Sequence, residues 1–142
     1  MTIESDPSNI GVVRTAVEAF GAKHGFTRDQ AEKVGLAVNE ALANVIEHGY
    51  QGDVHQPIEI SMDVLEADGC GRPALRLVIR DFGRHVDPAC IKSRNLSDVR
   101  PGGLGVHIIR SVMDDVRYRC VPEGGMELVM LKYMANVQES IP

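Results

Sequence analysis

Apolar residues recur at helical spacing in the first part of the chain. A first helix is predicted over residues 8–24 from apolar positions three or four residues apart: Ile10, Val13, Val17 and Phe20. Ser8 is expected to cap the N-terminus of this helix, and Gly25 to end it.

A second helix is predicted to start at Thr27, because Gln30 stands three residues later, where a capping box needs it. Its apolar positions are dense enough for a largely buried helix: Val34, Leu36, Val38, Ala41, Leu42, Val45 and Ile46. The helix is expected to run to about His48, with Gly49 providing the C-terminal cap.

From Pro57 the hydrophobic period changes to two, which predicts half-buried strands. The first strand alternates Ile58, Ile60, Met62 and Val64 with polar residues. Residues 68–71 are turn material, and residues 74–79 form the returning strand. A second hairpin is predicted from residues 116–121 and 127–133.

The remaining segments complete the predicted order of elements. A third helix is expected from Leu104 to Met113, a loop over residues 84–101, and a frayed polar tail after Met134. Helices followed by hairpins, without βαβ alternation, predict an α+β fold: a two-layer sandwich of an antiparallel or mixed sheet with helices on one face. The 142 residues suit one domain, residues 1–142.

Composition narrows the class of protein. A hydrophobic content of 44% with 25% charged residues is ordinary for a globular chain, and the net charge of −5 argues against nucleic acid as a partner. The polar start and the lack of a long apolar stretch predict neither a signal peptide nor a membrane segment, and the cysteine pattern indicates a reducing, cytoplasmic compartment. Cys70, Cys90 and Cys120 are odd in number and widely spaced, so they predict neither a disulfide framework nor a zinc site.

Glu40 and Asn44 lie one helical turn apart within the apolar run of the second helix. Burying such a pair without partners costs roughly 1–3 kcal/mol or more. An amide oxygen is a suitable ligand for Mg²⁺, and a carboxylate can deprotonate a nucleophile. By themselves, the two residues fit a solvated polar edge equally well.

Two further segments are candidates for nucleotide contacts. Asp81 follows an apolar strand, where its carboxylate can accept a hydrogen bond from an exocyclic amine, and Gly83 lets the backbone approach a flat ring. The glycines of residues 102–105 precede an amphipathic helix, whose free N–H groups suit phosphate. Alone, these segments are more often a turn and a flexible connection. A protein-kinase interpretation of Asp81-Phe-Gly83 fails, because the chain lacks the required glycine-rich loop and lysine.

The three segments in this order resemble the GHKL ATPase superfamily, which shares the Bergerat fold. In closer detail the chain is similar to the anti-sigma factor serine/threonine kinases of bacteria. The resemblance covers nearly the whole chain, and these segments carry it: Val38–Asn44, Glu47–Tyr50, Gly102–Ile109, Met113–Asp114 and Met130–Lys132.

This resemblance implies a role for each motif residue. Glu40 would be the general base and Asn44 would coordinate Mg²⁺, while Asp81 would bind the adenine amine of ATP with Gly83 against the ring. Residues 88–101 would form a lid over ATP. The nucleotide would also contact Gly103, Leu104 and Gly105, with the two glycines at its phosphates. The implied partners are a STAS-domain anti-sigma factor antagonist, which is phosphorylated, a sigma factor, which is sequestered, and a second copy in a homodimer.

Two departures from the family pattern qualify this expectation. His85 stands where many relatives have a second glycine of the adenine-binding box, and the usual opening strand is reduced to Thr2–Ser5. Two alternatives therefore stay open: a regulatory module that binds ATP without phosphotransfer, and a histidine-kinase-like ATPase domain from a larger protein. The second lacks support, since the chain shows no phosphoacceptor helix pair.

Overall fold

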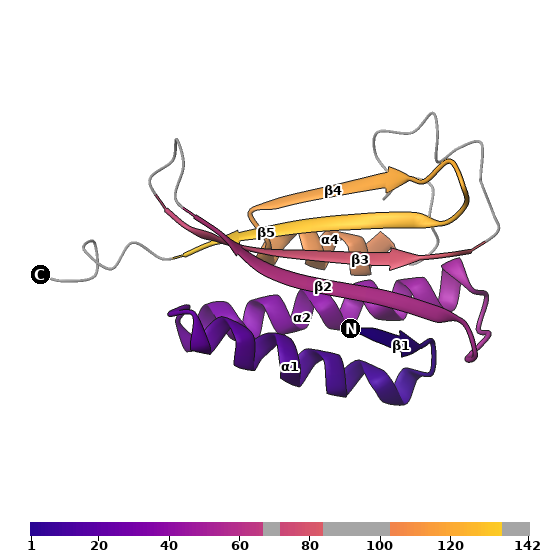
Figure 1. Cartoon of the computed structure of the whole chain (residues 1–142), viewed down its shortest axis with the longest axis horizontal. Coiled ribbons are helices and arrows are strands. Elements are labelled where there is room, and N and C mark those ends of the chain that lie inside the picture. Colours follow the sequence, from indigo (N-terminus) through magenta and orange to yellow (C-terminus); the bar gives the residue numbers. More distant parts are fainter. Residues whose placement is uncertain (67–71, 84–102, 135–142) are drawn as a thin grey trace, which may run out of the picture.

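A computed structural model describes residues 1–66, 72–83 and 103–134 of the chain (Figure 1). Its strands form one five-stranded sheet in the order β1-β2-β3-β5-β4, in which every neighbouring pair is antiparallel. The strands are β1 (Thr2–Glu4), β2 (Pro57–Leu65), β3 (Ala74–Asp81), β4 (Asp115–Cys120) and β5 (Met126–Tyr133). The α-helices are α1 (Ile10–Lys23), α2 (Arg28–Asn44) and α4 (Gly103–Val112). They lie on one face of the sheet, which confirms the predicted α+β arrangement.

Several predicted segments lie outside the described residues: the turn at 68–71, the whole loop over 84–101, and the tail after Met134. Within the described part of the chain, no helix combines the length and apolar character that crossing a bilayer requires.

The chain enters α1 differently from the prediction. A short 3₁₀ turn, η1 (Pro7–Asn9), precedes α1, and the Asp6 carboxylate accepts a hydrogen bond from the Ser8 backbone N–H at 2.9 Å. The N-cap expected at Ser8 is therefore wrong. Pro7 explains the shift, because its fixed φ and missing N–H suit the first position of a helical turn, and this moves the cap to the residue before it. Gly25 ends α1 as expected, with a positive φ of 89°.

Helix α2 begins as predicted and ends differently. Gln30 N donates to the Thr27 hydroxyl at 3.1 Å and Thr27 N donates to the Gln30 side chain at 3.2 Å, so the capping box is confirmed. At its other end α2 passes into a π turn, η2 (Val45–Gly49), with Tyr50 N bonded to the Val45 carbonyl at 2.8 Å. The C-cap expected at Gly49 is wrong, because the π turn extends the helix to include that residue.

The predicted alternation in the strands is confirmed by burial. Ile58 and Ile60 of β2 are buried while Glu59 between them is exposed, and the register sets Ile60 opposite Ile79 of β3. The inward side chains of the sheet meet those of α2 in one core, whose largest members include Val34, Val38, Leu42, Leu75, Leu77 and Met130. Burial of such side chains stabilises the fold by about 1.5–3 kcal/mol each.

Two hydrogen bonds hold the C-terminal end of α4 against the sheet. Lys132 Nζ donates to the Val112 carbonyl at 2.7 Å, which satisfies one of the free carbonyls at the helix end. The Asp114 carboxylate accepts from the Tyr133 N–H at 2.7 Å. With that end anchored, α4 packs along α2.

One expectation about the cysteines is wrong. Cys120, at the end of β4, is disulfide-bonded in the structure. Spacing along the chain did not indicate this bond, because disulfide formation depends on the distance between Cα atoms in the fold and not on sequence separation.

Candidate active site

The side chains of Glu40 and Asn44 meet α4 at Gly105. A Cβ atom built on Gly105 would stand 3.2 Å from Glu40 Oε1, 3.3 Å from Asn44 Nδ2 and 3.4 Å from Asn44 Oδ1. Any residue other than glycine at this position would therefore press on both polar groups. The structure thus brings two sequence motifs into contact, one from the end of α2 and one from the first turn of α4.

The amide of Asn44 is available to a ligand. Its Nδ2 atom is buried and has no hydrogen-bond partner within the part of the chain that the structure describes. A buried polar group without a partner costs about 1–3 kcal/mol, so native proteins leave few of them. The two ends of a carboxamide are interchanged by a flip, so the same position can present either the nitrogen or the oxygen. This atom is the strongest sign of a ligand at the site.

Asp81 is the last residue of β3, and only 6% of its surface is exposed. Its Oδ1 atom accepts hydrogen bonds from Gly83 N at 3.1 Å and Met126 N at 3.2 Å. Two backbone donors hold the carboxylate in one orientation, which strand position alone would not do. The carboxylate is therefore a fixed acceptor at the end of the sheet.

Asn44 and Asp81 line one small cavity between α2 and the sheet. Its volume is about 20 Å³, enough for a water molecule, and it is lined by Ala41, Asn44, Val45, Ile79, Asp81, Tyr118, Met126 and Leu128. Apolar walls with a few fixed polar groups are typical of sites for flat heterocycles. A purine ring is larger than this space, so its entry requires the lining side chains to move.

Two glycines, Gly83 and Gly125, let the backbone close around Asp81. A Cβ atom on Gly83 would stand 2.9 Å from the Gly49 carbonyl oxygen, and one on Gly125 would overlap the carbonyl oxygen of Asp81. Gly125 also has a φ of +85°, which favours glycine. The sequence interpretation missed Gly125 and Met126, because it assigned this segment only to a hairpin turn. The paired glycines before β5 were the available signal.

The predicted site residues therefore fall into two joined groups. Glu40 and Asn44 face Gly105, and Asn44 also shares the cavity with Asp81, beside which Gly83 lies. Gly103 and Leu104 belong to the first turn of α4. His85, Gly102 and the proposed lid over residues 88–101 lie outside the described residues.

No group of three or more metal-binding side chains forms in residues 1–66, 72–83 and 103–134. The described residues thus supply no cage made by protein alone. With the Asn44 amide flipped so that its oxygen takes the unpartnered position, this oxygen beside the Glu40 carboxylate fits Mg²⁺, which keeps several waters and takes most other ligands from substrate phosphates.

Comparison of the sequence with known proteins identifies its family. The chain is similar to the serine-protein kinase RsbW of Bacillus subtilis (strain 168), with 25% identity over 142 residues, covering 94% of this chain and 84% of that protein. The RsbW kinases of Halalkalibacterium halodurans and Staphylococcus aureus (strain Newman) are each 28% identical, over 94% and 97% of this chain and 82% and 87% of theirs. Residues 3–132 match the family model of the histidine kinase-like ATPase domain. The chain belongs to the histidine kinase-like ATPase domain family.

Proposed function

We propose that the chain is a cytoplasmic, ATP-dependent protein serine/threonine kinase, with residues 1–142 forming one catalytic domain. The family match and the relatives named serine-protein kinase support this activity. The observation that carries the proposal is the contact of Glu40 and Asn44 with Gly105, because it joins a base, a metal ligand and a glycine-rich helix start.

In this proposal Asp81 recognises the adenine of ATP. Its carboxylate accepts a hydrogen bond from the 6-amino group, and Gly83 lies against the ring. The supporting observations are the two backbone donors that fix Asp81 and the apolar cavity next to it. Binding of the ring opens that cavity by displacing side chains that line it.

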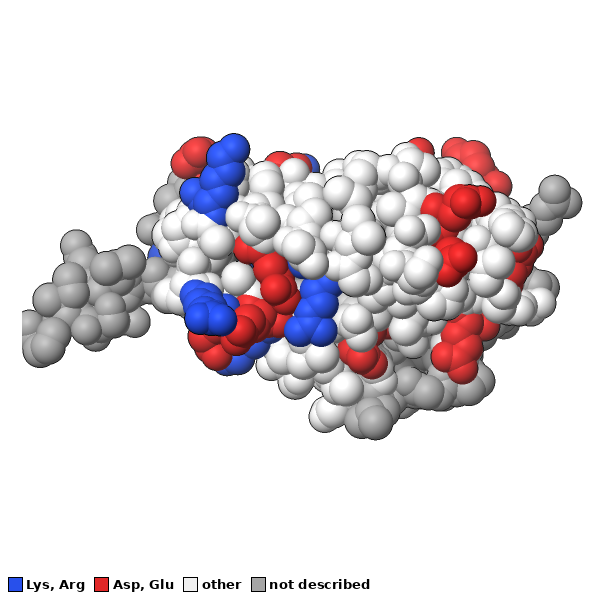
Figure 2. All heavy atoms as spheres, turned by 90° about the horizontal axis from the view of Figure 1, so that it is seen from below, with Lys and Arg blue, Asp and Glu red and all other residues white. Residues whose placement is uncertain are grey.

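The triphosphate lies between the end of α2 and the start of α4. Backbone N–H groups of Gly103, Leu104 and Gly105 donate to phosphate oxygens, as the free amides of a helix N-terminus do. Asn44 binds the Mg²⁺, which neutralises charge on the phosphates when bound. Figure 2 looks at the molecule from below and shows acidic side chains at the end nearest the C-terminal end of β3, with no Lys or Arg of the described residues visible there.

Glu40 acts as the general base in this mechanism. It takes the proton of a serine or threonine hydroxyl on the partner protein, and the hydroxyl oxygen forms a bond to the γ-phosphorus. The bond between that phosphorus and the ADP oxygen breaks, and ADP leaves with the electron pair. A base positioned in this way contributes about 10²–10⁴-fold to the rate.

The protein partners follow from the resemblance to anti-sigma factor kinases. We propose a STAS-domain anti-sigma factor antagonist as the phosphorylated protein, a sigma factor as the sequestered one, and a homodimer as the working form. None of these requires direct contact with nucleic acid or membrane.

The test is phosphate transfer from radiolabelled ATP to STAS-domain proteins of the same genome. The wild type is compared with Glu40→Gln, which keeps the side-chain shape. The control is Glu47→Gln, at an exposed position about two turns further along the same continuous helix. Transfer that is lost only in Glu40→Gln supports the proposal. Nucleotide-dependent partner binding without any phosphorylated product would instead favour a regulatory module that uses ATP as a structural ligand.

A further inference from the structure

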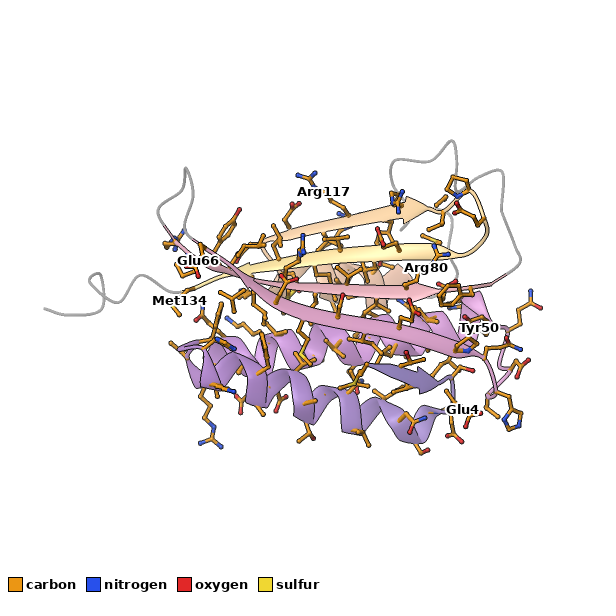
Figure 3. The ribbon with its side chains drawn as sticks, viewed as in Figure 1. Glu4, Tyr50, Glu66, Arg80, Arg117 and Met134 are labelled. Carbon is orange, nitrogen blue, oxygen red and sulfur yellow. The ribbon has the colours of Figure 1, made fainter. Side chains whose placement is uncertain are left out.

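Tyr50 connects the end of the continuous helix formed by α2 and η2 to the end of β3. Its hydroxyl accepts a hydrogen bond from the Phe82 N–H at 2.6 Å and donates one to the Pro57 carbonyl at 2.6 Å. The residue is 8% exposed, and both bonds are partly buried. In Figure 3 Tyr50 lies at the same end of the sheet as Arg80.

The hydroxyl occupies the place where the β2–β3 ladder stops. The register pairs Ile58 with Asp81, so the next residues in line are Pro57 and Phe82. Tyr50 bridges their carbonyl and N–H groups with one oxygen and thereby extends the connection between the strands beyond Asp81. The peptide group that it holds is the one that links Asp81 to Phe82.

The π turn brings Tyr50 to this position. Tyr50 N bonds to the Val45 carbonyl, a spacing of five residues in place of four, so the turn holds one residue more than an α-helical turn. Residues after the turn are therefore displaced by one position around the helix axis. The irregularity directly follows Asn44, and π turns of this kind occur frequently at functional sites.

Arg80 contacts the side chain of Phe82. The guanidinium of Arg80 stacks on the Phe82 ring at 4.6 Å and donates to the Gly124 carbonyl at 3.1 Å. Phe82 itself is 40% exposed, so its ring supplies little packing of its own. The hydrogen bond from the Phe82 N–H to the Tyr50 hydroxyl accordingly joins this peptide to the helical segment that follows Asn44.

We propose that Tyr50 is a positioning residue for purine selectivity: its hydroxyl fixes the Asp81–Phe82 peptide so that the Asp81 carboxylate meets the 6-amino group of adenine. This inference rests on the proposed function, because it needs adenine at Asp81. Tyr50 does not touch the nucleotide in this role. It acts through the backbone that sets the direction of the carboxylate, and it couples that direction to the position of Asn44.

The test compares two nucleotides on three proteins. ATP and purine riboside triphosphate, which lacks the 6-amino group, are titrated into wild type, Tyr50→Phe and Tyr133→Phe. The Tyr133 hydroxyl forms no hydrogen bond within the described residues, so Tyr133→Phe is the matched control. We expect the wild type and the control to prefer ATP by roughly tenfold or more, the value of a hydrogen bond to a charged acceptor. In Tyr50→Phe we expect that preference to fall at least about threefold while affinity for the analogue is unchanged.

A second variant covers the case in which Tyr50→Phe fails to fold. Replacing Phe82 by phenyllactic acid converts its amide to an ester, which removes the N–H and leaves the packing of Tyr50 intact. The same loss of preference for ATP is expected. An equal loss of affinity for both nucleotides, or full retention of the preference for ATP in the folded variants, would overturn the positioning role alone. Failure of wild type to bind ATP would overturn the proposed function and this inference with it.

Discussion

The carboxylate of Glu40 lies 3.2 Å from the point where a Cβ atom on Gly105 would stand. Asn44 meets the same point from one helical turn further along α2, with Nδ2 at 3.3 Å. At these distances a Cβ atom would force both polar side chains to shift by a few tenths of an ångström. The absence of a side chain at residue 105 therefore lets α4 approach the polar side chains of α2 without displacing them.

Gly105→Ala should separate activity from stability. Alanine in a helix is favoured over glycine by roughly 0.5–1 kcal/mol, yet its Cβ would displace Glu40 and Asn44. We expect phosphotransfer to fall at least tenfold, about 1.4 kcal/mol in the barrier, while the free energy of unfolding changes by less than about 1 kcal/mol. Gly11→Ala in α1 is the control, because a Cβ there meets nothing within 4 Å. Unchanged transfer in Gly105→Ala would contradict the contact.

Asp81→Asn should change which purine is preferred. The amide oxygen can still accept from Gly83 N and Met126 N, so the local fold is kept. Its NH₂ group now donates where the carboxylate accepted, which suits a 6-oxo group and opposes a 6-amino group. We expect the ratio of ATP to ITP affinity to fall at least tenfold, about 1.4 kcal/mol, in competition titrations. The same ratio in the variant and the wild type would remove Asp81 from the site.

Tyr50 should make the protein sensitive to alkaline pH. Burial raises the pKa of the Tyr50 phenol above its ordinary value of 10.0. Between that value and the folded-state pKa the unfolded chain loses this proton while the native state keeps it. The stabilisation is therefore complete below about pH 10 and is lost as the pH rises through the folded pKa.

Urea titrations across this pH range check the expectation. Above about pH 10 the unfolding free energy of the wild type should fall more steeply than that of Tyr50→Phe, which has no proton to lose. Parallel profiles of unfolding free energy against pH for the two proteins would show that this phenol does not contribute to the loss of stability at alkaline pH.

Thr27→Ala should weaken the fold and leave the site intact. Loss of a capping side chain costs about 1 kcal/mol, and Thr27 caps the end of α2 far along the helix from Asn44. The urea midpoint should drop in Thr27→Ala and recover in Thr27→Ser, which keeps the hydroxyl. ATP affinity should match the wild type in both. If Thr27→Ala lost ATP affinity together with stability, the site would depend on the overall stability of the fold.

Local signals predicted the parts of the fold that depend on neighbours in sequence. Thr27 and Gln30 form a capping box within four residues, and the alternation from Ile58 onward follows from one buried sheet face. The contacts around Asp81 could not be predicted in the same way, because the overlap with Gly125 arises only when β3 and β5 pair. The Tyr50 bridge likewise needs the π turn, which no residue pattern in the helix indicated.

No single motif predicted a shared site; only the motifs taken together did. Glu40 and Asn44 alone fit a solvated helix edge, and Gly105 alone fits a flexible connection. Their contact in the fold agrees with the expectation that the segments act together. Their chemical roles remain predictions, since they depend on a nucleotide that binds there.

The most direct test of the central claim is calorimetric titration of ATP, with and without Mg²⁺, into wild type and Asn44→Ala. Asn39→Ala is the control, since Asn39 is on the same helix but does not line the cavity. We predict Mg²⁺-dependent binding to the wild type and the control, and affinity at least roughly tenfold lower in Asn44→Ala. No binding of ATP by the wild type at millimolar concentration, or equal Mg²⁺-dependent binding by Asn44→Ala, would contradict the account.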